Sequence, residues 1–518
     1  MNEFSVITIM NEATINVLKS KKVDCSINLK MKEYLKDEAL FFRVSPQRAY
    51  EILSAVGVKK EQLEKLLERC MASSCDFAEI FEEEGTTESL SMLNGKLEDT
   101  NVLIRAGIGI RLYKGVQSVY GYTNETSEES LNALVDDLRG GFGIESKSVS
   151  ISLVEEKHEN RHPIKVNPVE ASLETKVALM VRANDAAKAY SDKIQKVSVG
   201  LASVCQNVQI SNSEGRLVHD TRIRCRMSVS SFAQDGQNLQ SGYEAPGASK
   251  GLEFFEERTP ESIGKEASRI ALVLLEAKDC PSGKMPVIID NGFGGVIFHE
   301  ACGHALEASS VSKNQSVFCN KLGQKVASDK VTAIDDGTIP NAWGSQNVDD
   351  EGNPQQKRVL IENGILKSYM IDRLNGRRMG LESTSSSRRQ SYKFETTSRM
   401  TNTYIAAGND DFDEMFEGIK RGLYAKKMGG GSVNPQTGEF NFAVLEGYLI
   451  EDGKISYPVK GASLIGNGAD ILFNIDRVGK NLERGQGMCG ASSGSIPTDV
   501  GQPAIRVSQI TVGGTANE

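Results

Sequence analysis

Long apolar runs are missing from this 518-residue chain, and no stretch approaches 18 uninterrupted apolar residues, so no transmembrane helix is expected. Basic residues are not in excess: 60 Lys and Arg stand against 69 Asp and Glu, and the net charge of −9 argues against general nucleic-acid binding. The first ten residues lack a basic region ahead of an apolar core, so no signal peptide is expected. The composition fits a soluble globular protein, and the length predicts about three domains.

Cysteine is present in an odd number, nine, and the cysteines are scattered without pair spacing. This pattern suits free thiols in a reducing cytoplasm rather than a disulfide framework. Histidine is scarce, with five in the whole chain, yet two of them flank a glutamate in His299-Glu300-Ala301-Cys302-Gly303-His304. Two neutral imidazoles can hold a zinc ion, and an adjacent carboxylate can take a proton from metal-bound water. The motif therefore predicts metal-assisted hydrolysis, most plausibly of a peptide bond.

The spacing of these histidines requires a distorted helix. The common zinc-peptidase motif places its ligands at i and i+4, whereas His304 follows His299 at i+5. In a regular α-helix these side chains would point roughly 140° apart. A π-bulge across Ala301–Gly303 would absorb the extra residue, and Gly303 permits the deformation. The surrounding pattern predicts a strand at Met285–Asp290, a glycine-rich turn, and a buried helix over Val296–Leu306.

A catalytic zinc site needs a third protein ligand, which spacing alone does not identify. His219 lies far upstream in a hairpin-like segment and is the less favoured candidate. Cys302 is inside the motif, but its position two residues before His304 directs it elsewhere. Cys319 is possible, and Cys489 lies between glycines that leave its sulfur accessible. A small buried thiol is the alternative interpretation for each of these cysteines.

The run from His299 to Glu307 resembles the active helix of the TldD branch of the TldD/PmbA metallopeptidase family. Other segments follow in the order found in that family, and the resemblance covers about residues 65–518, most densely after Met285. These segments are Gly337-Thr338, Asp349–Gly352, Leu360–Lys367, Arg399–Tyr404, Gly429–Gly431, Pro458–Gly466, Gly487–Gly490 and Val512–Thr515.

This resemblance implies that His299, His304 and Cys489 bind Zn²⁺ and that Glu300 is the catalytic base. It also implies peptidase activity on unstructured peptides or loosely folded proteins. The other branch of the family lacks the H-E-x-x-x-H residues and often pairs with the active branch. We therefore expect a dimer, either of this chain or with a motif-lacking paralogue, and no nucleic-acid or membrane partner. Two features depart from the family pattern, namely the extra residues 1–46 and the thiol of Cys302.

Composition and periodicity divide the chain into an N-terminal extension (1–46), an α+β domain (47–143), a polar linker (144–168), a second α+β domain (169–282) and a β-rich metallopeptidase domain (283–518). We thus expect an α+β fold in which a mixed N-terminal half precedes a mainly β C-terminal domain that carries one catalytic helix. Helices are predicted at Gln47–Met71, Val169–Tyr190, Thr259–Lys278 and Phe412–Leu423, and after a capping box at Thr126–Glu129. Hairpin turns are predicted at Asn94-Gly95, Lys114-Gly115, Glu214-Gly215, Asn363-Gly364 and Asp452-Gly453.

In the expected mechanism Glu300 takes a proton from zinc-bound water, and the hydroxide attacks the scissile carbonyl. The backbone of Gly429, Gly430 and Gly431 is a candidate for binding an extended substrate by strand addition, with a tight turn as the alternative. Arg388 and Arg389 suggest either recognition of a substrate carboxylate or a solvated basic pair, and the pattern favours the solvated pair.

Two other functions remain open. The dipeptidyl peptidase III family also has an H-E-x-x-G-H motif, but it takes its third ligand from a second helical motif soon downstream, and here the region after Glu307 is polar and strand-like. The alternative that is not an enzyme is a non-catalytic peptide-binding or regulatory partner of the same family. The intact His299, Glu300 and His304 argue against it.

Overall fold

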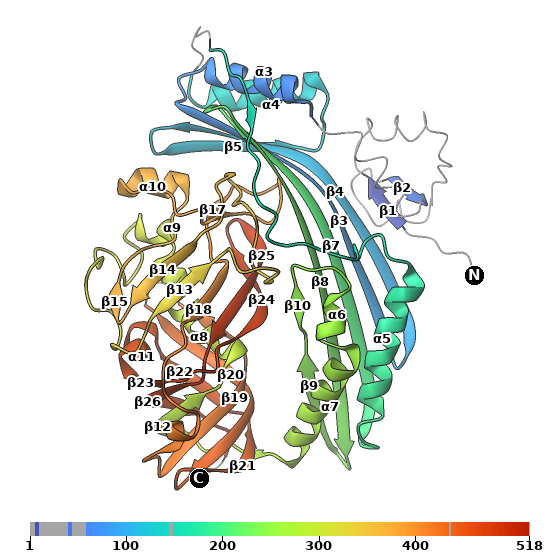
Figure 1. The fold of residues 1–518 in the computed structure, drawn as a ribbon, viewed down its shortest axis with the longest axis vertical. Coiled ribbons are helices and arrows are strands. Elements are labelled where there is room, and N and C mark those ends of the chain that lie inside the picture. The colour runs from blue at the N-terminus through green and yellow to red at the C-terminus, as the bar shows by residue number, and fades with distance from the viewer. Residues whose placement is uncertain (1–5, 10–39, 44–57, 144–148, 435–436, 517–518) are drawn as a thin grey trace.

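Two long antiparallel hairpins, β3–β4 and β7–β8, run through the first half of the molecule (Figure 1). The computed structural model describes residues 6–9, 40–43, 58–143, 149–434 and 437–516. The four strands contain 17, 19, 19 and 20 residues, so each spans roughly 55–65 Å. Asn94 and Gly95 have φ values of 48° and 79°, which suit the two-residue turn predicted there. The strands are β3 (Phe77–Leu93), β4 (Lys96–Lys114), β7 (Ile194–Asn212) and β8 (Arg216–Asp235).

These hairpins form one eight-stranded sheet in the order β10-β8-β7-β3-β4-β5, with β6 and β9 also paired to β8. β3 pairs with β7 from Glu79 opposite Asn212 to Leu93 opposite Ser198. A single sheet therefore runs through the two regions expected at 47–143 and 169–282, and the proposed division into domains stays a prediction. The added strands are β5 (Gln117–Thr123), β6 (Val154–Glu155), β9 (Asn238–Glu244) and β10 (Gly247–Ala248).

Helices cover the two ends of this sheet (Figure 1). A separate hydrophobic core lies beneath the helices at each end. The N-caps of three of them are serine or threonine side chains that accept a backbone N–H: Ser127, Ser172 and Thr259. The cap at Ser127 lies one residue beyond the predicted start of the capping box. The helix expected from Gln47 begins at Lys60; residues 47–57 lie outside the described part of the chain. The helices are α3 (Lys60–Met71), α4 (Glu128–Gly140), α5 (Leu173–Lys188), α6 (Phe254–Glu257) and α7 (Pro260–Glu276).

Five strands of the C-terminal half form a closed ring. β12 pairs with β19, β19 with β20, β20 with β22, β22 with β26, and β26 returns to β12. Closure leaves these five strands without a free edge over their paired lengths. The largest hydrophobic core packs against this ring and includes Ala301, Cys302 and Ala305 of the histidine motif. The ring strands are β12 (Gly283–Ile289), β19 (Arg421–Val433), β20 (Glu439–Glu451), β22 (Ser463–Asn467) and β26 (Ile505–Gly513), joined by β11 (Lys278–Asp279), β21 (Lys454–Lys460) and β23 (Ile475–Val478).

A six-stranded sheet in the order β15-β14-β13-β18-β25-β24 lies beside the ring, and a two-stranded ribbon pairs β16 with β17. The helix predicted at Phe412–Leu423 is wrong: Asp413–Phe416 forms one 3-10 turn, and Arg421 already begins β19, whose pairing with β20 overrides the local helical pattern. The remaining elements are β13 (Ala333–Asp336), β14 (Lys357–Glu362), β15 (Ile365–Leu366), β16 (Ser387–Arg388), β17 (Thr397–Ser398), β18 (Asn402–Ile405), β24 (Glu483–Ala491), β25 (Gly494–Gln502), α9 (Ala308–Val311), α10 (Arg373–Met379) and α11 (Gly468–Asn474).

Buried arginines join the long sheet to the C-terminal half. Arg111 of β4 donates to Glu351 at 2.7 Å, and Arg222 of β8 donates to Asp350 at 2.7 Å. Arg389 donates to Glu79 of β3 at 2.8 Å, so the expectation of a solvated Arg388-Arg389 pair is wrong: both side chains are buried. Paired and hydrogen-bonded ions of this kind favour one docking geometry, because any other leaves a buried charge unpaired.

Little of the expected extension 1–46 lies within the described residues. There, β1 (Val6–Ile9) and β2 (Leu40–Arg43) pair antiparallel. None of the described helices is long and apolar enough to span a membrane.

A second ionic contact links α7 to the ring and makes the stability of the fold depend on pH. Arg269 donates to both carboxylate oxygens of Glu446 in β20, at 2.9 and 2.6 Å. Burial raises the pKa of Glu446, but Arg269, Tyr448 and Lys426 together bring it to about 2. A pKa below that of the unfolded chain means that this stabilisation is complete above about pH 5 and is lost as the pH falls toward 2.

We expect Glu446→Gln to lower the free energy of unfolding by about 2–3 kcal/mol at neutral pH, with the difference from the unsubstituted protein shrinking steadily between about pH 5 and pH 3. Urea unfolding across this pH range measures it. A difference that stays constant with pH would show that the lost stability comes from packing rather than charge.

Candidate metal centre

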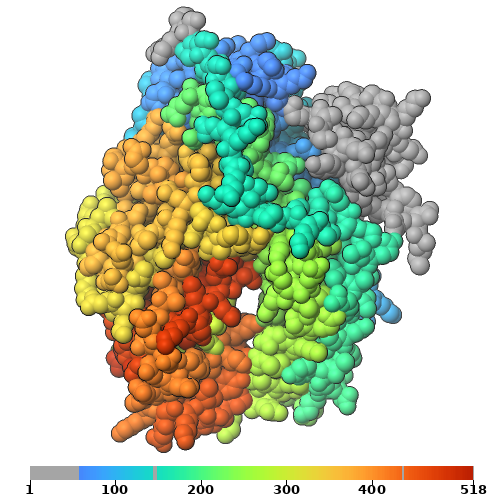
Figure 2. All heavy atoms as spheres, viewed as in Figure 1, coloured from blue at the N-terminus to red at the C-terminus, as the bar shows by residue number. Residues whose placement is uncertain are grey.

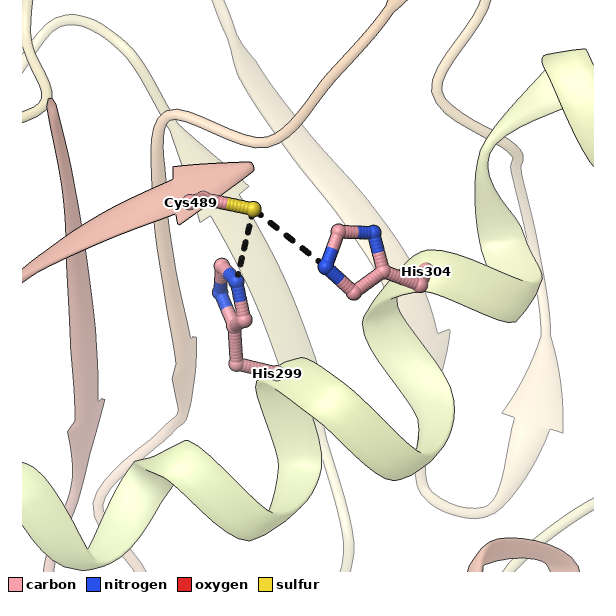
Figure 3. Close-up of side chains that lie close together, drawn as sticks. All are labelled: His299, His304 and Cys489. Carbon is pink, nitrogen blue, oxygen red and sulfur yellow. Dashed lines mark hydrogen bonds between the residues drawn. The ribbon is translucent and has the colours of Figure 1, made fainter. Parts of the chain in front are cut away.

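The histidine motif forms a π-helical turn. It lies between a short α-helical turn, α8 (Val296–Phe298), and a 3-10 turn, η4 (His304–Leu306), and is labelled η3 (His299–Gly303). The His304 N–H donates to the His299 carbonyl, five residues back. Both imidazoles consequently face the same side, with ring centroids 5.2 Å apart (Figure 3). The distortion predicted from the i+5 spacing is confirmed.

Neighbouring groups pack closely against the other faces of this turn, so small residues are needed in the turn and opposite it. A Cβ on Gly303 would lie 2.4 Å from the Met400 sulfur. The Cys302 thiol donates to the Gly468 carbonyl at 3.4 Å, so it points away from the two imidazoles. A Cβ on Gly468 would lie 2.2 Å from the Ala301 carbonyl oxygen, which explains the glycine at the start of α11.

Cys489 approaches the imidazoles from a different element, strand β24 (Figure 3). Its sulfur lies 3.4 Å from His299 Nε2 and 3.2 Å from His304 Nε2. The only tryptophan of the chain, Trp343, supports the strand by donating from Nε1 to the Gly487 carbonyl at 2.8 Å. The structure thus brings together the three residues expected to bind metal, and their ligand atoms all lie within 4.8 Å of one another.

The other candidates for a third ligand lie elsewhere. His219 is exposed on β8 and is not part of this group. The Cys319 thiol donates to the Val311 carbonyl at 3.6 Å. All eight cysteines in the described ranges are free thiols.

The electrostatics of the group favour a thiolate. Burial raises the pKa of Cys489, but the adjacent imidazoles of His299 and His304 more than reverse this effect and lower it to about 3. Burial lowers the pKa of His304, whereas the carboxylate of Glu307 and the Cys489 sulfur raise it well above its usual range. The thiolate is the form of cysteine that binds metals.

The donor set and its geometry fit zinc. Two imidazole nitrogens and a thiolate are typical zinc ligands, and a catalytic site uses three protein ligands with one position open. In a tetrahedral site with Zn–S of about 2.3 Å and Zn–N of about 2.0 Å, sulfur and nitrogen are roughly 3.5 Å apart. The observed separations of 3.4 and 3.2 Å lie close to that value.

Glu300 is the accessible member of the site. Its side chain is 31% exposed, whereas His299 and Cys489 are 2% and 4% exposed. Its Oε2 lies 3.6 Å from His304 Nε2. The carboxylate therefore lies beside the group of ligands, in contact with solvent, where it can exchange protons with a molecule bound there.

Two further residues contact the site, and sequence reasoning assigned neither of them a role. Glu307 Oε2 accepts from His304 Nδ1 at 3.2 Å, and Arg399 donates to the Cys489 carbonyl at 2.6 Å. The spacing of three residues between His304 and Glu307 on a helical turn is a signal that could have identified the first contact. Nothing in the sequence signals the second, because its partners are 90 or more residues away.

Gly429, Gly430 and Gly431 lie in β19, where the pairing with β20 is irregular between Met428 and Gly431. Gly430 and Gly431 are exposed, and Gly429 is buried. They form part of a strand rather than the tight turn that was the alternative.

Three family models match consecutive parts of the chain. They describe PmbA/TldA metallopeptidase domain 1 (residues 78–140), the central domain (167–275) and the C-terminal domain (282–514). Curated relatives match over nearly their whole length. Metalloprotease TldD homologues from Buchnera aphidicola and Haemophilus influenzae are each 36% identical and cover 90% of this chain and 98% of their own. A metalloprotease of Methanocaldococcus jannaschii is also 36% identical, over 86% of this chain and 98% of its own.

Solved structures share the fold. One is the crystal structure of a Thermotoga maritima protein described as a suggested modulator of a DNA gyrase. It superposes with a TM-score of 0.72 at 23% identity and covers 88% of this chain and 99% of its own. TldE from Thermococcus kodakarensis gives a TM-score of 0.68 at 20% identity, covering 88% and 100%. These neighbours confirm the mixed α+β fold. The family models and the sequence relatives show that the chain belongs to the TldD branch of the TldD/PmbA family of metallopeptidases.

Proposed function

We propose that this protein is a zinc-dependent peptidase that cleaves unstructured peptides or loosely folded proteins. The observation that carries the proposal is the convergence of His299, His304 and Cys489, with Glu300 exposed beside them. The family membership supports hydrolysis of peptide bonds, and the donor set supports zinc over harder cations, which prefer oxygen ligands.

In this mechanism His299 Nε2, His304 Nε2 and the Cys489 thiolate would hold the ion, which would supply Lewis-acid activation of the attacking water and the scissile carbonyl. Glu300 takes a proton from that water as it attacks and passes the proton to the leaving amine. Its partial exposure lets it reach both positions, while burial keeps the ligands in place.

An extended substrate fits the surroundings of Cys489. β24 is the terminal strand of its sheet, so its outer edge has no partner among the described strands. Figure 2 shows an opening through the molecule between the red C-terminal strands and the green central region. A hollow of about 210 Å³ on the long sheet adjoins this region, and Arg226, which lines it, donates to the Gln486 carbonyl of β24. This arrangement supports an extended substrate beside β24.

Cys489→Ser should reduce zinc affinity by more than about 100-fold, because loss of residues that merely orient a ligand already costs 10–100-fold. Metal analysis of the purified protein measures this. Cys302→Ser is the matched control, since that buried thiol faces Gly468 and should leave the zinc content unchanged. Equal zinc content in Cys489→Ser and the unsubstituted protein would reassign the third ligand.

Glu300→Gln should lower cleavage of an unfolded casein-type substrate by at least about 100-fold, the usual contribution of a general base, with bound zinc unchanged. The assay is best run on the chain alone and with a co-expressed motif-lacking paralogue, because the family resemblance implies a partner. Retained turnover in this variant would remove Glu300 from the mechanism.

Gly430→Val tests the glycine triplet. A Cβ at Gly430 has no atom within 4 Å, so the fold should tolerate the change. If the triplet binds substrate backbone, the branched side chain should raise KM several-fold and leave zinc content and thermal stability alone. Unchanged peptide kinetics would exclude a role of Gly430 in substrate binding.

A further inference from the structure

We propose that Arg399 is a positioning residue that connects the strand bearing Cys489 to the helical turn bearing His304, with Glu307 as the link. This inference rests on the proposed zinc centre and concerns how that centre is held together. Arg399 touches neither the ion nor the substrate in this proposal, and it acts through the ligands.

The centre needs such a connection because its ligands come from two elements far apart in the chain. His299 and His304 share one turn, but Cys489 lies 185 residues after His304, on the terminal strand of its sheet. Most side chains of β24 are exposed or half-buried, and Met488 next to Cys489 is 53% exposed. Pairing with β25, together with Trp343 and Arg226 on the carbonyls of Gly487 and Gln486, holds the strand before Cys489 and leaves Cys489 itself to be fixed by another group.

Arg399 holds the strand. Its Nη2 donates to the Cys489 carbonyl at 2.6 Å, and its Nη1 donates to the Ser493 hydroxyl at 2.9 Å and to the Gly494 carbonyl at 3.0 Å. These acceptors are the ligand residue itself and the turn that connects β24 to β25. The guanidinium is fully buried, so it binds both ends of this short segment in one geometry.

The opposite edge of the same guanidinium faces the helical turn. Arg399 Nε lies 3.8 Å from Glu307 Oε1, and Glu307 Oε2 lies 3.2 Å from His304 Nδ1. Both Arg399 Nε and Glu307 Oε1 are buried without a hydrogen-bond partner among the described residues, and they face each other as an ion pair. Glu307 is 4% exposed, and a buried carboxylate requires a nearby cation.

The contact through Glu307 also orients the ring of His304. The carboxylate accepts from Nδ1, and the opposite ring atom, Nε2, faces the Cys489 sulfur. Arg399 in turn orients that carboxylate. A planar guanidinium can donate in several fixed directions at once, whereas a lysine ammonium at the end of a flexible chain cannot reproduce the three contacts to the strand.

A buried arginine also stabilises a fold in general, so the test requires a matched control. Arg358 is buried to a similar degree, donates to the carbonyls of Thr384 and Ser385, and pairs with Asp335. It makes the same kinds of contact without touching the three candidate ligands. Arg358→Lys should therefore lower stability in the same way as Arg399→Lys but leave the metal centre intact.

The experiment uses the full-length protein and Zn²⁺ alone as the probe. Competition with a chromophoric chelator gives the zinc dissociation constant, and Co²⁺ substitution gives the thiolate-to-metal absorption band. Arg399→Lys and Glu307→Gln should each weaken zinc binding roughly 10–100-fold and alter the cobalt spectrum, while Arg358→Lys stays within about threefold of the unsubstituted protein.

The inference would be overturned by an Arg399→Lys variant that folds and has the same zinc affinity and cobalt spectrum as the unsubstituted protein. If Arg399→Lys does not fold, the near-isosteric Glu307→Gln decides, and normal zinc affinity in that variant overturns it equally. Failure of the proposed function has a different signature: the unsubstituted protein would bind no zinc, or Cys489→Ser would bind it as tightly.

Discussion

One extra residue in a single helical turn is the constraint on which the site depends. In a regular α-helix His299 and His304 would diverge by roughly 140°, and no third residue could join them at one ion. The π turn removes that divergence, and the structure surrounds it with groups that leave little room for an α-helical alternative. Met400 packs where a side chain on residue 303 would lie, and Gly468 presses against the carbonyl of Ala301. The π turn is therefore held by its neighbours rather than by local propensity.

The thiolate depends on a different set of contacts. Cys489 reaches the imidazoles only because β24 pairs with β25, β25 runs parallel to β18, and Trp343 and Arg399 hold the carbonyls of Gly487 and Cys489. The six-stranded sheet is in turn fixed against the long sheet by buried arginine–carboxylate pairs such as Arg222 with Asp350. The geometry of three ligand atoms thus rests on the docking of the two halves of the molecule, and changes at that interface should reach the metal centre.

Local patterns in the sequence predicted those features of the fold that depend on residues close together in the chain. The i+5 spacing predicted the π turn, and Asn-Gly and Asp-Gly pairs predicted hairpins. The caps of α4 and α7 lie at or next to the polar residues that indicated them. Pairing between distant segments could not be predicted in this way.

The apolar pattern of Phe412–Leu423 resembles a helix, but pairing with β20 makes its last residues part of a strand. Arg388-Arg389 resembles a surface pair, but its acceptors, Met400 and Glu79, are 12 and 310 residues away. The role of Arg399 belongs to the same class, because its contact with Cys489 is made across 90 residues and leaves no period or spacing to detect.

The distribution of exposure across the site separates two tasks. Metal ligands work best when they cannot move, and His299 and Cys489 are almost fully buried. In the proposed mechanism the base must meet a water molecule and then a leaving amine, and Glu300, at 31% side-chain exposure, is the most accessible of these side chains. Because Glu300 and His299 are adjacent residues on the π turn, the same backbone distortion that aims one side chain inward presents the next at the surface of the site. The turn thereby determines both the ligand geometry and the side from which a substrate can approach.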